Sequence, residues 1–321
     1  MPKKHERKTK KAHDAEAGED SPKVHRNRAQ AFVSNEARER YLRHARVSPE
    51  ESVEEAWGIP LGVSIPFLRW VADTYLSTDT DIQGNPIGHF AVTSEQLVNG
   101  KANFGWTGPS PTDFSVKKHT AKERVSFVDW CLHKGHVNDK DGRLFFGRAT
   151  HFVSHAWHGN FFTLLDCVCS HVLQGDQSGA DTSVIQSRLE NTFLYIDMFV
   201  VNQHRAPWHR QHNPWSARRL THHVIKSTGT TLMVTNYISK PLWLSRLWCL
   251  YELVVTVEER GAVELCLTPR ESKRIRKDLA LETLPFENFA SMFATIDTRT
   301  AECSLEDDSK ELRKFLEEAD G

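Results

Sequence analysis

Apolar runs and helix-like patterns alternate along the chain from residue 150 onward. Short runs rich in Val, Leu and Phe predict buried strands, and apolar positions repeated every three or four residues predict helices. The predicted strands span 150–154, 192–200, 231–237 and 262–268. The predicted helices span 161–173, 217–227, 245–260, 270–281, 286–294 and 305–319. This alternation predicts an α/β domain over 149–321, a three-layer sandwich with a central parallel sheet.

Polar and aromatic residues stand where the predicted strands end. In open parallel sheets, ligands bind at the carboxyl ends of the strands, near the point where strand order reverses. We therefore expect one crevice at this edge of the sheet, next to the start of helix 245–260. Its candidate lining residues are Ser154, His155, Trp157, Asp197 and Asn236.

The predicted helix 245–260 carries one narrow polar stripe on an otherwise apolar surface. Ser245, Cys249, Glu252 and Thr256 follow one another at spacings of four, three and four, which places them on one helix face. A carboxylate among apolar neighbours is paired, turned to solvent, or part of a functional site. Cys249 is interpreted first as a small buried thiol, with a nucleophile as the alternative.

Two segments precede the α/β pattern. Residues 1–30 are strongly charged and poor in apolar side chains, so they cannot offset their chain entropy and are expected to be disordered. Their basic run is most simply a solvated tail, with nuclear targeting or nucleic-acid contact as the alternative. Residues 31–148 are expected to form a mainly helical or irregular N-terminal extension packed on the main domain, with helices over 65–76 and 121–132.

Composition narrows the functional classes. The formal net charge of −1 argues against a globally basic nucleic-acid-binding protein. The six cysteines form no CxxC pair, so we expect a reducing, cytoplasmic location, with a nuclear one as the alternative. No apolar run approaches the roughly 18 residues of a membrane span, so no membrane partner is expected. The absence of a glycine-rich phosphate loop argues against Rossmann dehydrogenases and P-loop NTPases.

A histidine-rich segment follows the predicted strand 192–200. His204, His209 and His212 stand there at spacings of five and three, together with two tryptophans. We interpret the segment as a lid over the crevice. Imidazole also binds zinc and similar ions, but this spacing is not a recognised ligand signature, so no metal site is predicted.

Four stretches, in this order, resemble the sequence boxes of a TIR (Toll/interleukin-1 receptor-like) domain. They are Phe152-Val-Ser-His-Ala-Trp157, Tyr195-Ile-Asp197, Leu232-Met-Val-Thr-Asn-Tyr237 and Ser245-Arg-Leu-Trp-Cys-Leu-Tyr-Glu-Leu253. The last box is the most specific and is closest to plant-type domains. Ser-His-Ala-Trp, with Asn202-Gln-His204, also resembles a TIR-like group of algae and other unicellular eukaryotes. The resemblance covers about 150–320 and implies a flavodoxin-like fold.

This resemblance implies an activity. TIR domains divide between adaptors that assemble signalling complexes and enzymes that cleave the nicotinamide–ribose bond of NAD. In the enzymes a glutamate of the third helix is associated with catalysis, and by position this is Glu252. A carboxylate stabilises the oxocarbenium-like state of such a cleavage. NAD or a related nucleotide would then be the substrate rather than a cofactor, and self-association would complete the cleft.

The implied nucleotide-binding residues are Ser154, His155, Trp157, Asp197, Asn236 and Cys249. Ser154 and His155 would contact the phosphates or the nicotinamide, Trp157 would stack on a ring, and Asp197 would bind a ribose. For three of them a structural role is the alternative: a cap or turn for Ser154, a core-edge aromatic for Trp157 and a strand end for Asp197.

The segment 201–216 departs from the plant-type pattern, because it is longer than the short glycine-rich loop found there. Two other functions therefore stay open. One is a non-catalytic module that signals by self-association through its helices. The other is a nucleoside deoxyribosyltransferase-like enzyme, which would transfer the sugar to a nucleobase instead of water.

Overall fold

The structure of the chain, a computed structural model, describes the residues on which the following sections rest. They are residues 60–76, 92–100, 114–173, 182–204, 215–239, 241–281, 296–303 and 306–319. The predicted tail 1–30, the predicted helix 286–294, and His209 and His212 lie outside these stretches.

Within the described residues, a six-stranded sheet has the order β2-β1-β4-β3-β5-β6. The strands are β1 (Leu61–Val63), β2 (Phe146–Arg148), β3 (His151–Ser154), β4 (Leu194–Tyr195), β5 (Thr230–Thr235) and β6 (Ala262–Leu267). β4, β3, β5 and β6 run parallel, whereas β1 pairs antiparallel with β2 and β4. If these four parallel strands are numbered in sequence order, their order in the sheet is 2-1-3-4. This order is compatible with a flavodoxin-like sandwich.

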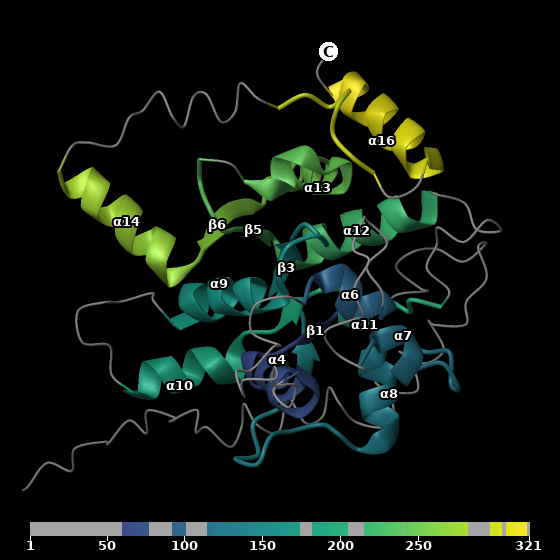
Figure 1. Cartoon of the computed structure of the whole chain (residues 1–321), viewed down its shortest axis with the longest axis vertical. Coiled ribbons are helices and arrows are strands. Elements are labelled where there is room, and N and C mark those ends of the chain that lie inside the picture. The colour runs from purple at the N-terminus through teal and green to yellow at the C-terminus, as the bar shows by residue number, and fades with distance from the viewer. Residues whose placement is uncertain are drawn as a thin grey trace, which may run out of the picture.

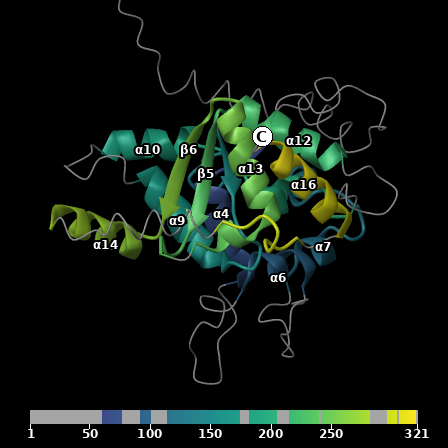
Figure 2. The ribbon, with the colours of Figure 1, turned by 90° about the horizontal axis from the view of Figure 1, so that it is seen from above.

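Helices cover both faces of this sheet (Figure 1), as the sequence predicted. α9 (Phe161–Leu173) packs on β5 and β6, while α12 (Trp215–Thr228) and α13 (Leu247–Glu258) pack on the opposite face. α16 (Glu306–Ala319) lies over α13 as an outer helix, which Figure 2 shows from above. None of the helices in the described stretches is long and apolar enough to cross a membrane.

The remaining helices connect these layers or belong to the extension. They are α4 (Ile65–Val71) with its π-helical continuation η1 (Ala72–Leu76), α6 (Ser94–Asn99), α7 (Val116–His119), α8 (Phe127–Lys134), α10 (Thr182–Asn191), α11 (Asp197–Val200), the 3₁₀ turn η2 (Leu242–Ser245) and α14 (Pro269–Ala280).

Three boundaries differ from the sequence prediction. The helix predicted over 121–132 is α8, which begins only at Phe127, after the cap residue Ser126. The strand predicted over 192–200 is wrong in its second half, because β4 ends at Tyr195 and α11 begins at Asp197. Met198, Phe199 and Val200 are buried in this short helix, and a continuous apolar run does not distinguish a buried helix from a buried strand. The helix predicted from Ser245 begins at Leu247, so Ser245 lies in η2 and is exposed.

The N-terminal extension also differs from the prediction, because it contributes two strands to the sheet. β1 and β2 continue the sheet beyond β4. Phe67 of α4 joins the two parts: its ring centroid lies 5.2 Å from that of Phe146 in β2 and 5.3 Å from that of Phe199 in α11. Extension and sheet therefore share one apolar core, and the extension supports the helix that begins at Asp197.

One buried acid of the extension is poorly satisfied. Asp129 is 1% exposed, and its Oδ2 accepts a hydrogen bond of 2.8 Å from the hydroxyl of Ser126, the N-cap of α8. Its Oδ1 has no hydrogen-bond partner. Burial raises the pKa of Asp129 to about 7, against the weaker opposing effect of the Ser126 hydrogen bonds. The folded state therefore holds a proton here that the unfolded chain releases near pH 4.

We expect Asp129→Asn to stabilise the protein at pH 8. The folded pKa lies above the unfolded one, so the wild type loses stability as the pH rises from about 4 through about 7. The shift alone corresponds to about 4 kcal/mol, but the buried amide of Asn also needs partners, so we expect a gain of about 2 kcal/mol. Urea unfolding at pH 5 and pH 8 measures it. The exposed Asp141→Asn is the control, and equal stability of Asp129→Asn and wild type at pH 8 would contradict the prediction.

Candidate active site at the carboxyl end of the sheet

The site is built around a contact between a strand end and a helix. Ser154 is the last residue of β3, a strand that lies between β4 and β5 in the sheet. Its hydroxyl donates a hydrogen bond of 2.5 Å to Oε2 of Glu252, which α13 carries over the same end of the sheet. The helix face that holds Glu252 is fixed by Thr256, whose hydroxyl bonds to the Glu252 carbonyl at 2.6 Å and to Thr231 of β5 at 2.7 Å.

Glu252 is held in its protonated form in the free protein. Burial raises the pKa of its carboxyl to about 8, and the negative charge of Asp197 adds to the rise, while the Ser154 hydrogen bond opposes it. The residue as a whole keeps some exposure, so the carboxyl is crowded by protein and still open to a ligand. A carboxyl in this state responds strongly to a nearby positive charge, which would favour the ionised form.

Asp197 is anchored at two points, by side chains from two segments. As the first residue of α11, it accepts a hydrogen bond of 3.0 Å at Oδ2 from the indole Nε1 of Trp157. Its main-chain carbonyl accepts another of 3.0 Å from Nε2 of Gln203, which is 2% exposed. The Oδ1 atom is buried and has no partner. The carboxylate is thus rigidly placed, with one acceptor oxygen left for a ligand donor.

His155 supplies a second unpartnered acceptor. It is 8% exposed, and burial lowers its pKa, against the opposing charge of Asp197 and a backbone hydrogen bond to Val153. Because Nε2 has no partner, the ring nitrogen that bonds to Val153 is Nδ1. A neutral ring that donates from Nδ1 keeps a lone pair on Nε2. Buried acceptors are normally hydrogen-bonded, so His155 Nε2 and Asp197 Oδ1 are expected to bind O–H or N–H donors of a ligand or of water.

Cys249 belongs to this cluster as a thiol. It is 3% exposed and lies one turn before Glu252, next to the Ser154 hydroxyl. Burial raises the pKa of the thiol far above its ordinary value, and ionisation of Glu252 would raise it further. A thiol is a poor nucleophile in that state, which favours the structural interpretation over the nucleophilic one.

The structure brings together six of the seven site residues that the sequence predicted. They are Ser154, His155, Trp157, Asp197, Cys249 and Glu252. Asn236 is not tied to this cluster by any hydrogen bond that the described residues show. It follows β5 in a bend, three residues beyond Met233, the partner of Ser154 in the sheet, which corresponds to about 10 Å along an extended strand.

Arg246 is a residue whose part in the site the sequence analysis missed. It is 8% exposed and precedes α13, with Nη1 at 3.1 Å from Nε2 of His158 and 3.5 Å from Oε2 of Glu302. Its main chain also bridges to that of Glu302. These bonds fix the start of the helix that carries Glu252. The position of Arg246 in the Ser245–Leu253 box could have marked it as a site residue. No pattern in the neighbouring sequence indicated its partners His158 and Glu302.

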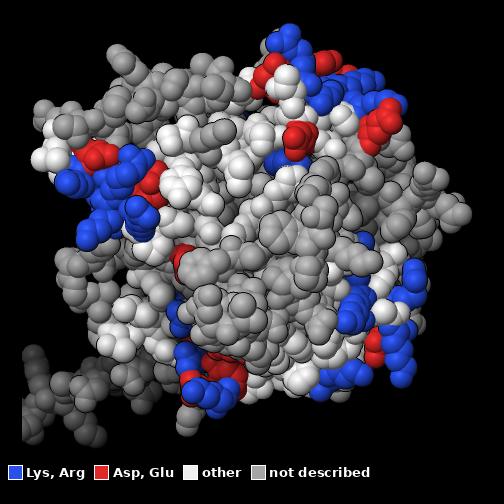
Figure 3. Space-filling view, in the orientation of Figure 1, with Lys and Arg blue, Asp and Glu red and all other residues white. Residues whose placement is uncertain are grey.

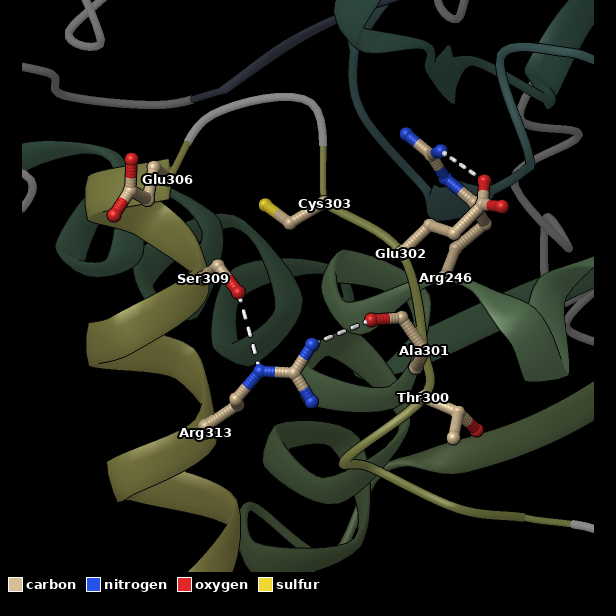
Figure 4. A pocket seen from close by; sticks show the side chains of 8 residues that line it. All are labelled: Arg246, Thr300, Ala301, Glu302, Cys303, Glu306, Ser309 and Arg313. Carbon is tan, nitrogen blue, oxygen red and sulfur yellow. Dashed lines mark hydrogen bonds and ion pairs between the residues drawn. The ribbon is translucent and has the colours of Figure 1, made fainter.

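Arg246 also borders an open pocket of about 430 Å³ between α13, α16 and the segment 300–303 (Figure 4). The second guanidinium of this pocket belongs to Arg313, which donates to the Ala301 carbonyl at 2.9 Å and to Ser309 at 3.1 Å. Both positive groups are thus engaged by protein acceptors. We assign this pocket a structural role in holding α16 against the start of α13.

The histidine-rich segment is described only as far as His204. That residue bonds to Thr120 of the extension, at 2.8 Å from Nε2 to Oγ1. Within the described stretches, no group of three or more His, Cys, Asp or Glu side chains is arranged to hold a metal ion. His209 and His212 lie outside them, so the predicted lid is not described.

Comparisons of the chain with protein-family models, with curated proteins and with solved structures give no match.

Proposed function

We propose that the chain is a TIR-type domain that cleaves the N-glycosidic bond of NAD or a related nucleotide, with Glu252 as the catalytic carboxylate. The buried Glu252–Ser154 contact at the carboxyl end of β3 is the observation that carries this proposal. It combines a carboxyl of raised pKa with the edge of a parallel sheet where ligands bind, and perturbed carboxyls of this kind gather at active sites.

The chemistry suits a single carboxyl group. NAD carries a positive charge on the nicotinamide ring, and its approach would lower the pKa of Glu252 and favour the carboxylate. As the bond between ribose C1′ and nitrogen breaks, the electron pair leaves with nicotinamide, which becomes neutral. Positive charge moves to the ribose, where the carboxylate stabilises it. Water then adds to C1′ and releases one proton.

The unpartnered acceptors of the site support a ribose as the bound group. His155 Nε2 and Asp197 Oδ1 each require a donor, and the two hydroxyls of a ribose are a pair of donors. Under this assignment His155 binds a ribose hydroxyl, and not the phosphates or the nicotinamide that the resemblance implies, because a neutral acceptor nitrogen offers a phosphate no proton. Trp157 holds Asp197 with its indole N–H and keeps its ring partly exposed for stacking.

Nicotinamide release from NAD by concentrated purified protein tests the proposal. We expect release that rises more steeply than linearly with protein concentration, because self-association would complete the cleft. A strictly linear dependence would contradict the assembly, and no release at concentrations where the protein self-associates would contradict the enzyme. A parallel reaction with added nucleobase separates hydrolysis from transfer, since a transferase would yield the exchanged nucleoside.

A non-catalytic self-association module is the second candidate. Exposed apolar side chains on α13 and on the segment between β5 and α13 favour it: Val257 is 63% exposed, Tyr237 60% and Leu242 44%. Such side chains are common on contact surfaces between proteins. Under this function Val257→Glu would abolish self-association while Glu252→Gln would have no effect on signalling.

A further inference from the structure

A positively charged surface of the extension meets the segment that follows Asp197. Thr120, the residue that caps the end of α7, lies at the centre of this surface. Lys117 precedes Thr120 by three residues, and Arg124 follows it by four. The main-chain N–H of Arg124 donates to the Thr120 carbonyl at 2.8 Å. Arg124 lies in the turn after the helix, and the charges of both side chains act on His204, so both lie on the side of α7 that faces this residue. Figure 3 shows Lys and Arg side chains at the lower right of the molecule, where Figure 1 places α7 and α8.

His204 enters this surface from the other segment. The Thr120 hydroxyl donates to the Val116 carbonyl at 2.8 Å, so the 2.8 Å contact between Thr120 Oγ1 and His204 Nε2 has the imidazole as donor. Protonation of His204 then takes place at Nδ1. Asn202 fixes the approach of the two segments, donating to the Arg124 carbonyl at 2.8 Å and accepting from the His204 N–H at 3.0 Å.

Neither Lys117 nor Arg124 forms an ion pair with an acid among the described residues, and neither would His204 when protonated. Burial lowers the pKa of His204, and the charges of Arg124 and Lys117 lower it further. Burial also lowers the pKa of Lys117. The neighbouring acid, Glu123, is engaged by Lys134 in an ion pair of 3.2 Å. Like charges gathered at a partly buried place are a recurrent basis for anion binding.

This surface lies close to the candidate active site. Gln203 donates to the Asp197 carbonyl, and His204 is the next residue, so its Cα lies within about 12 Å of that carbonyl. The other cation near the site, Arg246, is already bonded to His158 and Glu302. A nucleotide with its ribose at Glu252 and Asp197 therefore has one described group of uncompensated cations within reach of its phosphates.

We propose that Lys117, Arg124 and His204 form a phosphate-binding subsite that holds the diphosphate of the nucleotide cleaved at Glu252. The identity of the nucleotide rests on the proposed function, whereas the affinity for a diphosphate does not. The N-terminal extension then has a binding role in addition to its two strands. Arginine and lysine would supply charge-assisted hydrogen bonds, and His204 would supply a third once Nδ1 is protonated.

Binding should strengthen as the pH falls. A bound diphosphate favours the charged form of His204, so protonation and binding are coupled. The groups whose charges act on His204 are Lys117 of α7 and Arg124 of the following turn. Both phosphates of a dinucleotide such as NAD keep their charges between about pH 6 and 8, so the pH dependence of its binding would come from His204, and His204→Gln should remove it.

The test is calorimetric titration of the full chain with inorganic pyrophosphate, in the Glu252→Gln background so that no turnover takes place. We expect Lys117→Gln and Arg124→Gln each to weaken binding about tenfold, as the loss of a charge-assisted hydrogen bond does. Lys134→Gln is the matched control, since its charge is paired with Glu123, and should change the affinity less than twofold. Affinities unchanged in both test variants, or lowered equally in the control, would overturn the subsite.

Competition with NAD identifies the bound molecule. In the same Glu252→Gln protein, saturating NAD should displace pyrophosphate, and Arg124→Gln in the active protein should raise KM with kcat nearly unchanged. Pyrophosphate that binds equally well beside NAD would overturn the assignment to the nucleotide and indicate a separate phosphate site. Competition without any nicotinamide release from the wild type would support the subsite and contradict the proposed catalysis.

Discussion

Replacing Glu252 by Gln is expected to reduce nicotinamide release by about a thousandfold or more. The variant keeps the size of the side chain and a hydrogen-bond acceptor for Ser154, but it cannot acquire the negative charge that stabilises a ribose cation. The fall should be in kcat more than in KM, because the charge matters most in the transition state. Glu258→Gln, on an exposed position of the same helix, is the control and should leave the activity unchanged.

The pH dependence checks the same residue independently. Because burial raises the pKa of Glu252 to about 8, kcat/KM for the wild type should rise with pH through about 8 as the carboxylate forms. Ser154→Ala removes the hydrogen bond that lowers this pKa, so its profile should move to higher pH. Turnover by folded Glu252→Gln at the wild-type rate would exclude Glu252 from the mechanism.

The stability of Glu252→Gln should not fall. The folded pKa exceeds the ordinary value of 4.5, so the folded state binds more protons than the unfolded chain between about pH 4.5 and 8. Stability of the wild type is therefore lost as the pH rises through that window, and the neutral variant avoids the loss. A loss of activity in a protein that unfolds no more readily than the wild type would thus be a loss of chemistry rather than of structure.

Replacing Gly62 by Ala is expected to destabilise the whole protein by about 3 kcal/mol. Gly62 is the middle residue of β1, which lies between β2 and β4. An added Cβ would lie 2.8 Å from the main-chain carbon of Phe193 and 3.0 Å from Leu194 N and Ala149 Cα. These backbone atoms belong to or adjoin strands and cannot turn aside as a side chain does, so β1 must separate from β4.

Urea unfolding followed by tryptophan fluorescence and by circular dichroism measures this effect. Because extension and sheet share one core, both signals should move together in a single transition. Gly135→Ala provides the comparison: its Cβ would meet nothing within 4 Å, and the cost of its positive φ of 81° is about 1 kcal/mol. A separate early transition in Gly62→Ala, with the parallel strands still folded, would show that the extension is an independent unit.

Several features of the candidate site followed from local sequence. Ser154, Trp157 and Asp197 were expected where strands end, and Glu252 was singled out because helix 245–260 is otherwise apolar. The structure gathers these four. Asn236 was named by the same rule but is not joined to them, since the rule gives the edge of the sheet and not the length of the bend beyond it.

The residues that the sequence analysis missed act through distant partners. Gln203 and Arg246 both lie in or next to motifs that drew attention, yet their roles depend on the Asp197 carbonyl and on His158 and Glu302. The pairing of Thr120 with His204 joins residues 84 positions apart. No local pattern encodes such contacts, because the extension and the segment after Asp197 meet only when the sheet is formed.

The sequence by itself determined the main strands and helices from residue 150, apart from α10 and α11, the apolar character of α13 and the position of Glu252 on its polar stripe. Periodicity carries this information because each element must bury one face. Only the tertiary structure decided that β1 and β2 extend the sheet, that residues 197–200 are helical, and that Ser154 meets Glu252 across 98 positions. Strand pairing and burial bring distant residues together, and it is burial among those residues that keeps Glu252 protonated and leaves His155 Nε2 without a partner.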